Sequence, residues 1–183
     1  SIVGGELGGD PTGVHRVFDA QFDSVTVNAP VQVLNAGSLT LEGPWLENNS
    51  DIEVNPSGGF ILTRVIAAAD TELRGTGVLR MSRPAAAGGA RIDIDPGVRL
   101  TNGVSHSIEG SGVIAGELFN SGQIDANVTG ETIVIDGLGA TSSNDGWMIS
   151  SSGGQLFLTD FEVDNTDGVD AFACSQKGES SAG

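Results

Sequence analysis

Carboxylate side chains gather near the C-terminal end of the 183-residue sequence. Asp160, Glu162 and Asp164 alternate along the chain, and Asp167 and Asp170 follow closely. Alternate residues of a strand share a face, so the first three would project together, with the last two in the following turn. Ca²⁺ prefers such oxygen ligands. Asp164, Asp167 and Asp170 are therefore candidate Ca²⁺ ligands. The alternative is a solvated acidic face, because the spacing does not match an EF-hand loop.

Few other residues could do chemistry. Cys174 is the single cysteine, which excludes an internal disulfide. A catalytic thiol needs a nearby histidine, whereas His15 and His106 lie far from it in sequence. We therefore expect Cys174 to be a small buried side chain. We expect His106 to point outward from a strand rather than to act as a general base.

The charge balance excludes several partners. Eight Lys and Arg stand against 24 Asp and Glu, which gives a net charge of −16. Such a surface repels the phosphates of nucleic acids and of anionic membranes.

No apolar run is long enough for a membrane-spanning helix. The sequence begins at Ser1 without a recognisable signal peptide, so we expect it to be a piece of a larger or processed protein.

A short cassette recurs along the chain. An apolar-x-apolar pair leads to a turn with Asn, Asp, Ser or Pro, then to glycine, then to a second apolar pair, as in 31–41, 52–62, 92–100 and 147–158. Its turn glycines are Gly37, Gly58, Gly77, Gly97, Gly122 and Gly153. A degenerate repeat of this kind is typical of a solenoid. The sequence therefore predicts an all-β, single-stranded parallel β-helix (β-solenoid) with rungs of about 20 residues.

An antiparallel sandwich is the alternative, since it also has short strands with frequent turns. Hairpin-type dipeptides occur at Asn102-Gly103, Asp136-Gly137, Asp145-Gly146 and Asp167-Gly168. For the solenoid we expect three parts. Residues 1–20 form an N-terminal loop or cap, residues 21–174 the β-solenoid domain, and residues 175–183 a flexible C-terminal end.

One stretch resembles a known family. Residues 118–135, together with 100–103 and 108–114, resemble repeats of large secreted bacterial β-helix proteins of the filamentous-haemagglutinin and autotransporter-passenger type. The resemblance spans roughly residues 90–160 and is one of repeat style. It implies a right-handed parallel β-helix outside the cytoplasm, with a surface, adhesive or matrix role. Relatives of this type usually have more rungs, which again suggests a segment of a longer protein.

A second resemblance involves a motif. Asn165-Thr166-Asp167 is similar to the Asn-Thr-Asp motif of polygalacturonase-type glycoside hydrolases, in which Asp167 would be a catalytic carboxylate. An inverting hydrolase needs a second carboxyl group. The downstream Asp-Asp, Gly-His-Gly and Arg-x-Lys motifs of that family do not occur in this sequence, which ends 16 residues after Asp167. The sequence given therefore does not hold that active site.

The leading functional hypothesis is a secreted, non-enzymatic structural or adhesive β-solenoid at the cell surface or in a matrix. Unpaired strand edges at its ends would favour head-to-tail self-association into a rod or fibre segment. The alternative is a polysaccharide-active β-helix, either a hydrolase or lyase fragment or a carbohydrate-binding module. Cell-surface glycans would then be partners, with Trp45 and Trp147 as candidate stacking residues. Asn48 and Asn127 lie in glycosylation sequons.

Overall fold

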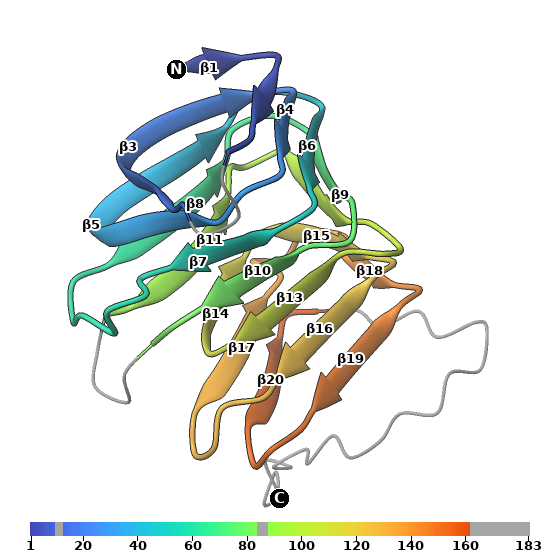
Figure 1. Cartoon of the computed structure of the whole chain (residues 1–183). Helices are drawn as coiled ribbons and strands as arrows, with labels where there is room; N and C mark the ends of the chain where they lie inside the picture. Colours follow the sequence, from blue (N-terminus) through green and yellow to red (C-terminus); the bar gives the residue numbers. More distant parts are fainter. Residues whose placement is uncertain (10–12, 84–87, 162–183) are drawn as a thin grey trace, which may run out of the picture.

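The computed structural model describes residues 1–9, 13–83 and 88–161 of the chain. Within them the regular elements are all strands, and every strand pairing is parallel. The chain winds through about seven turns of about 23 residues each. Figure 1 shows the turns stacked from the blue N-terminal end to the orange-red end. The β-solenoid prediction is confirmed.

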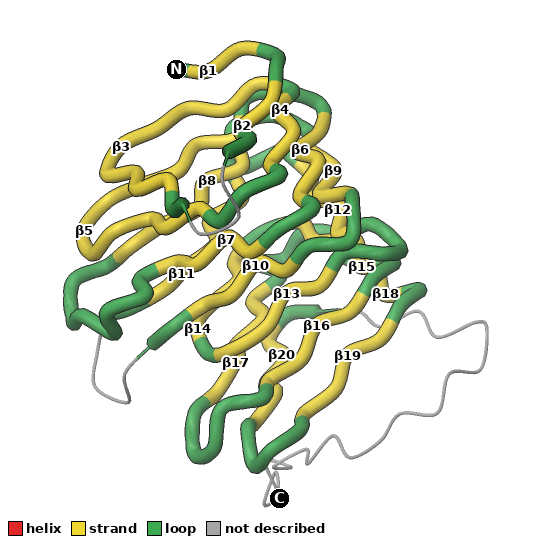
Figure 2. Tube along the Cα trace, in the orientation of Figure 1, coloured by secondary structure: helices red, strands yellow, loops and turns green. Residues whose placement is uncertain are grey.

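Each turn passes through three faces. Face 1 contains β7 (Asp51–Val54), β10 (Val78–Met81), β13 (Ser107–Gly110), β16 (Gln123–Ala126) and β19 (Trp147–Ser150). Face 2 contains β1 (Ile2–Val3), β8 (Thr63–Ala67), β11 (Ala90–Ile94), β14 (Gly112–Ala115), β17 (Thr132–Asp136) and β20 (Gln155–Thr159). The long strands β3 (His15–Asp23) and β5 (Val31–Leu41) bend from face 1 into face 2 and join the two into one sheet (Figure 2).

Face 3 is a separate sheet. It contains β2 (Glu6–Leu7), β4 (Val25–Val27), β6 (Trp45–Asn48), β9 (Thr71–Arg74), β12 (Arg99–Asn102), β15 (Glu117–Asn120) and β18 (Ser143–Asn144). The dipeptides that suggested hairpins at Asn102-Gly103, Asp136-Gly137 and Asp145-Gly146 lie at corners, where the chain passes to the next face. Asp167-Gly168 lies outside the described residues.

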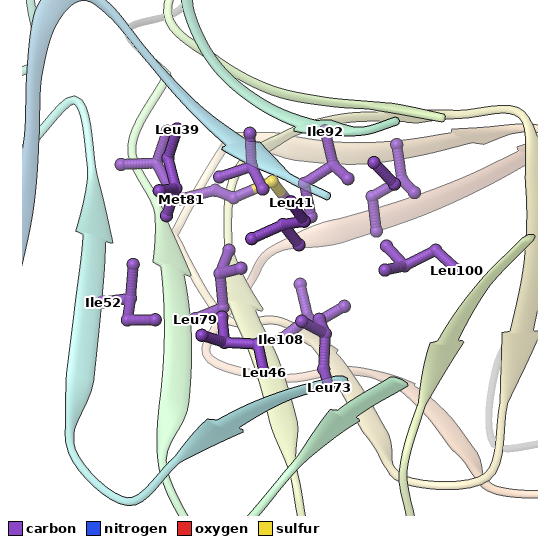
Figure 3. Close-up of a cluster of buried hydrophobic side chains, with 14 of the residues drawn as sticks. Leu39, Leu41, Leu46, Ile52, Leu73, Leu79, Met81, Ile92, Leu100 and Ile108 are labelled. Atoms are coloured by element: carbon purple, nitrogen blue, oxygen red, sulfur yellow. The ribbon is translucent and has the colours of Figure 1, made fainter. Parts of the chain in front are cut away.

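The interior is filled by columns of aliphatic side chains. On face 2 the register stacks Leu39, Val65, Ile92, Ile114 and Ile135 directly over one another, and each is at most 1% exposed. Figure 3 shows such side chains pointing into the ring from all three faces. Each fully buried aliphatic side chain stabilises the fold by about 1.5–3 kcal/mol. The alternation of buried and exposed positions follows the period of two in the sequence.

A turn has about 23 residues, against the expected 20. The spacing of the turn glycines does not equal this length, because these glycines occupy three different corners. Gly37, Gly58 and Gly153 lie between faces 1 and 2, Gly77 and Gly122 between faces 3 and 1, and Gly97 between faces 2 and 3. Their intervals therefore do not measure whole turns. Corner glycines still have a steric cause: a Cβ on Gly122 would lie 2.3 Å from the carbonyl oxygens of Gly103 and His106.

The solenoid also begins earlier than residue 21. β1 pairs with β3, β2 pairs with β4, and β3 itself starts at His15. Residues expected to form a loop or cap thus supply strands of the first turns, since even the short pair Ile2-Val3 continues the ladder. Ile2 and Val3 remain exposed, at 36% and 73%, because only one neighbouring turn covers them. The residues expected to form the flexible end, 175–183, lie outside the described part.

Candidate functional site

The predicted Ca²⁺ ligands Asp164, Asp167 and Asp170 lie outside the described residues, as do Cys174 and the Asn-Thr-Asp motif at 165–167. Asp160, which follows β20, is exposed. Over residues 1–9, 13–83 and 88–161, no group of three or more His, Cys, Asp or Glu side chains is arranged to hold a metal ion. The calcium site therefore stays a prediction.

His106 was expected to face outward, and that prediction was wrong. Its side chain is 1% exposed and lies inside the corner between faces 3 and 1, just before β13. His106 Nδ1 lies 2.7 Å from Asn102 Oδ1, and His106 Nε2 lies 3.2 Å from Asn48 Nδ2. In this position the ring satisfies Asn102 Oδ1 and Asn48 Nδ2, two buried polar atoms for which the described residues supply no other hydrogen bond.

These contacts belong to a hydrogen-bonded row, here called the corner chain: Asn48, His106, Asn102, Asn120 and Asn144. Asn102 Nδ2 donates to Asn120 Oδ1 at 2.7 Å, and Asn120 Nδ2 donates to Asn144 Oδ1 at 2.6 Å. Those three asparagines stack in register on β12, β15 and β18. The corner chain therefore links successive turns through side chains, in addition to the backbone ladder.

Two backbone groups determine which side-chain atoms of the corner chain donate hydrogen bonds and which accept them. Asn102 Nδ2 also donates to the carbonyl oxygen of Gln123 at 3.1 Å, which can only accept, so Asn102 Oδ1 must face His106. His106 Nδ1 therefore carries the proton. Asn48 Oδ1 accepts from the Ser50 N–H at 3.2 Å, so Asn48 Nδ2 donates to His106 Nε2. Both ring nitrogens are thus satisfied in the neutral Nδ1–H tautomer.

His106 reaches Asn48 across an intervening turn. The corner of that turn contains Gly75 and Gly77, and a Cβ on Gly77 would lie 2.7 Å from Asn48 Cγ and Nδ2. A side chain on Gly77 would therefore collide with the Asn48 amide. Burial of the ring lowers the pKa of His106 from 6.5 to about 4, because removal from water disfavours the charged form. The histidine is therefore neutral at pH 7 and acts as a structural polar residue.

The two sequons differ in accessibility. Asn48 is fully buried within the corner chain, so its amide is closed to glycosylation in the folded chain. Asn127 is half-buried, and its Nδ2 donates to Glu109 Oε2 at 3.2 Å.

The two tryptophans lie on different faces and do not form one platform. Trp45 lies on β6 of face 3, with the Arg74 guanidinium 4.1 Å from its ring centroid. Arg99 covers Phe119 on the same face in the same way, at 4.0 Å. Trp147 lies on β19 of face 1 and is 55% exposed. One side of the Trp45 ring is thus covered by a cation, whereas Trp147 presents a large exposed surface.

Several outward-facing arginines pair with carboxylates of neighbouring turns. On face 1, Arg80 lies 3.6 Å from Asp51 on the preceding turn and 2.9 Å from Glu109 on the following turn. On face 3, Arg74 contacts Glu47 at 3.3 Å and Arg99 contacts Glu117 at 2.7 Å. Each such surface pair contributes at most about 1 kcal/mol. Their arrangement ties neighbouring rungs together along the outside.

A lateral cleft opens at the corner between faces 1 and 2. The corner cleft, of about 540 Å³, is lined by Arg83, Glu131, Thr132, Ser150, Gln155 and Phe157, among others. These residues come from the loop after β10, the start of β17, the end of β19 and the first part of β20. The volume lies in the range of roughly 300–1,000 Å³ usual for small-molecule sites. No local pattern in the sequence indicates this cleft, since residues 83 and 157 are 74 positions apart.

Comparison of the chain with protein-family models, curated proteins and solved structures gave no significant match. In the part of the chain that the structure describes, no helix is long and apolar enough to cross a membrane.

Proposed function

We propose that this chain is a non-enzymatic structural β-solenoid that acts as a stiff rod or fibre segment outside the cell and associates end to end. The observation that supports this proposal best is the unbroken stacking of parallel turns. Aliphatic columns inside, the corner chain at one edge and ion pairs outside all connect one turn to the next. Bonding along the axis in three separate layers favours a rod that resists bending.

The last described turn supports association through the ends. Met148, Leu156 and Leu158 continue the inward columns, and all three are only partly buried. Their respective partners in the preceding turn, Ile124, Ile133 and Ile135, are fully buried. Strand edges and apolar side chains at an end of a solenoid favour pairing with a further turn. A second copy of the chain is the occupant we propose.

Sedimentation velocity and negative-stain imaging over a range of protein concentrations test this function. The native chain is expected to form linear stacks as its concentration rises. Leu158→Glu places a charge in the end surface and is expected to keep the chain monomeric. Thr159→Glu, on the adjacent outward position of β20, is expected to leave stacking intact. A native chain that stays monomeric at every concentration, with and without Ca²⁺, contradicts the proposal.

A further inference from the structure

The corner that holds Arg83 beside the cleft is short and tightly packed. Ser111 alone connects β13 to β14, whereas on the following turn residues 127–131 lie between β16 and β17. Gly110 and Gly112 flank Ser111, and a Cβ on Gly110 would lie 2.0 Å from the Met81 carbonyl oxygen. This corner is therefore packed tightly against its neighbour.

Ser111 also holds one wall of the cleft. Its buried hydroxyl accepts from the Arg83 N–H at 3.1 Å and donates to the Arg83 carbonyl oxygen at 3.1 Å. The backbone of Arg83 is thus fixed from both sides. Among the described residues, the ion pairs of the chain include neither Arg83 nor Glu131, although both line the cleft. A cation and an anion thus lie in one cleft without forming a pair across it.

Other lining residues of the cleft offer hydrogen-bonding groups and an apolar ring. Thr132 Oγ1 donates to Gln155 Oε1 at 3.5 Å, which leaves the Gln155 amide nitrogen directed away from that bond. Phe157 is 52% exposed and stands at the end of an outward apolar column with Val113 and Val134. Unlike Trp45 and Phe119, Phe157 is not covered by an arginine in the described part of the chain.

This combination fits one class of ligand. A sugar ring has hydroxyls that both donate and accept, together with an apolar C–H face. A guanidinium and an amide nitrogen supply donors, a carboxylate supplies an acceptor, and an exposed aromatic ring packs against the apolar face. The charges of Arg83 and Glu131 offset each other within the cleft. The chain as a whole carries a net charge of −16, so an anionic sugar would be repelled. We infer that the corner cleft is a binding subsite for a neutral glycan.

The subsite does not depend on end-to-end association, so the two proposals can fail separately. Binding is tested by calorimetry on the full chain with hexasaccharides of β-1,4-glucose, β-1,4-xylose, β-1,4-mannose and β-1,3-glucose. Hexagalacturonate serves as the anionic comparison. At least one neutral hexasaccharide is expected to bind, with saturation at one site per chain. Binding of none of the neutral probes, or of hexagalacturonate alone, overturns the inference.

Matched variants locate the bound glycan. Phe157→Ala and Arg83→Gln are each expected to weaken binding by about tenfold or more, as for central contacts of an interface. Phe18→Ala removes an equally exposed phenylalanine, 55% against 52%, and Arg64→Gln removes an arginine on face 2. Both controls are expected to bind like the native chain. Equal affinity of Phe157→Ala and the native chain refutes the assignment.

A second readout does not require variants. In amide chemical-shift mapping on the native chain, the largest perturbations on addition of the bound hexasaccharide are expected at Gly130, Gly154 and Gln155, which line the cleft. Perturbations centred on Trp147 or Trp45 instead would place the glycan elsewhere and overturn the inference.

Discussion

The buried histidine of the corner chain should make folding sensitive to mild acid. The pKa of His106 is lowered from 6.5 to about 4 by burial. In the unfolded chain the histidine binds a proton as the pH falls through 6.5, whereas in the folded chain it stays neutral down to about pH 4. Its contribution to stability is therefore fully present above pH 6.5, falls progressively between pH 6.5 and 4, and has reached its lowest value below pH 4.

The size of the effect follows from the shift. The lowering from 6.5 to about 4 corresponds to about 3 kcal/mol at about 1.4 kcal/mol for each pKa unit. A single domain is typically stable by only about 5–15 kcal/mol, so this loss would be readily measured. The chain also carries 24 Asp and Glu side chains, which the comparison must hold constant. The native chain must therefore be compared with His106→Gln, which keeps a polar side chain but cannot bind the proton.

Urea unfolding followed by circular dichroism, at pH values from 7.5 to 4, gives the free energy of unfolding for both chains. Between pH 7 and 4 the native chain is expected to lose about 3 kcal/mol more than His106→Gln. If the variant does not fold, nitrogen NMR of the native chain gives the same information directly, with His15→Gln used to assign the second histidine. Equal pH dependence of the two chains, titration of His106 near its ordinary pKa, or an Nε2–H tautomer would refute the reasoning.

Three further substitutions test the packing, each through the free energy of unfolding in urea. Asn120→Ala removes the link between Asn102 and Asn144 in the corner chain. It is expected to cost about 1–3 kcal/mol, because the Asn102 amide loses a buried acceptor; a neutral effect would show that the corner chain adds little stability. Ile114→Ala is expected to cost about 2–5 kcal/mol and its outward neighbour Val113→Ala much less, since Ile114 is fully buried; equal costs would contradict the assigned faces. In Gly122→Ala the new Cβ would lie 2.3 Å from two carbonyl oxygens, whereas in Gly97→Ala nothing lies within 4 Å of it. Gly97→Ala is expected to cost roughly 1 kcal/mol of backbone strain, and Gly122→Ala is expected to cost more. The reverse order would contradict the corner packing.

The fold could be predicted because its determinants are local. Period-two alternation and recurrent turn glycines indicate which side chains face inward. In a parallel solenoid, where each turn stacks on the previous one, this is nearly enough to predict the fold class. The length of a turn could not be obtained in this way. Gly58 and Gly77 look equivalent in sequence but lie at different corners, and the loops at the three corners vary independently.

The site was harder to predict because its contacts are long-range. His106 has the alternating neighbours of an outward strand residue, yet Asn48, 58 positions away, decides its orientation. An available signal was the set of asparagines ending the face 3 strands at Asn48, Asn102 and Asn120, which a correct turn length would have aligned. The corner cleft joins Arg83 to Phe157 over several turns, and no local pattern indicates such a juxtaposition.

Cross-linking between turns tests most directly whether the strands stack in parallel and in this register. Thr40 and Ile66 are paired outward positions on β5 and β8, and Cα atoms of directly paired residues lie within the roughly 4.4–6.8 Å that a disulfide spans. With Cys174→Ser as background, Thr40→Cys/Ile66→Cys is expected to form a disulfide under mild oxidation. Thr40→Cys/Arg64→Cys, displaced by two residues, is expected to stay reduced. Oxidation of the displaced pair in place of the direct pair would contradict the stacked solenoid.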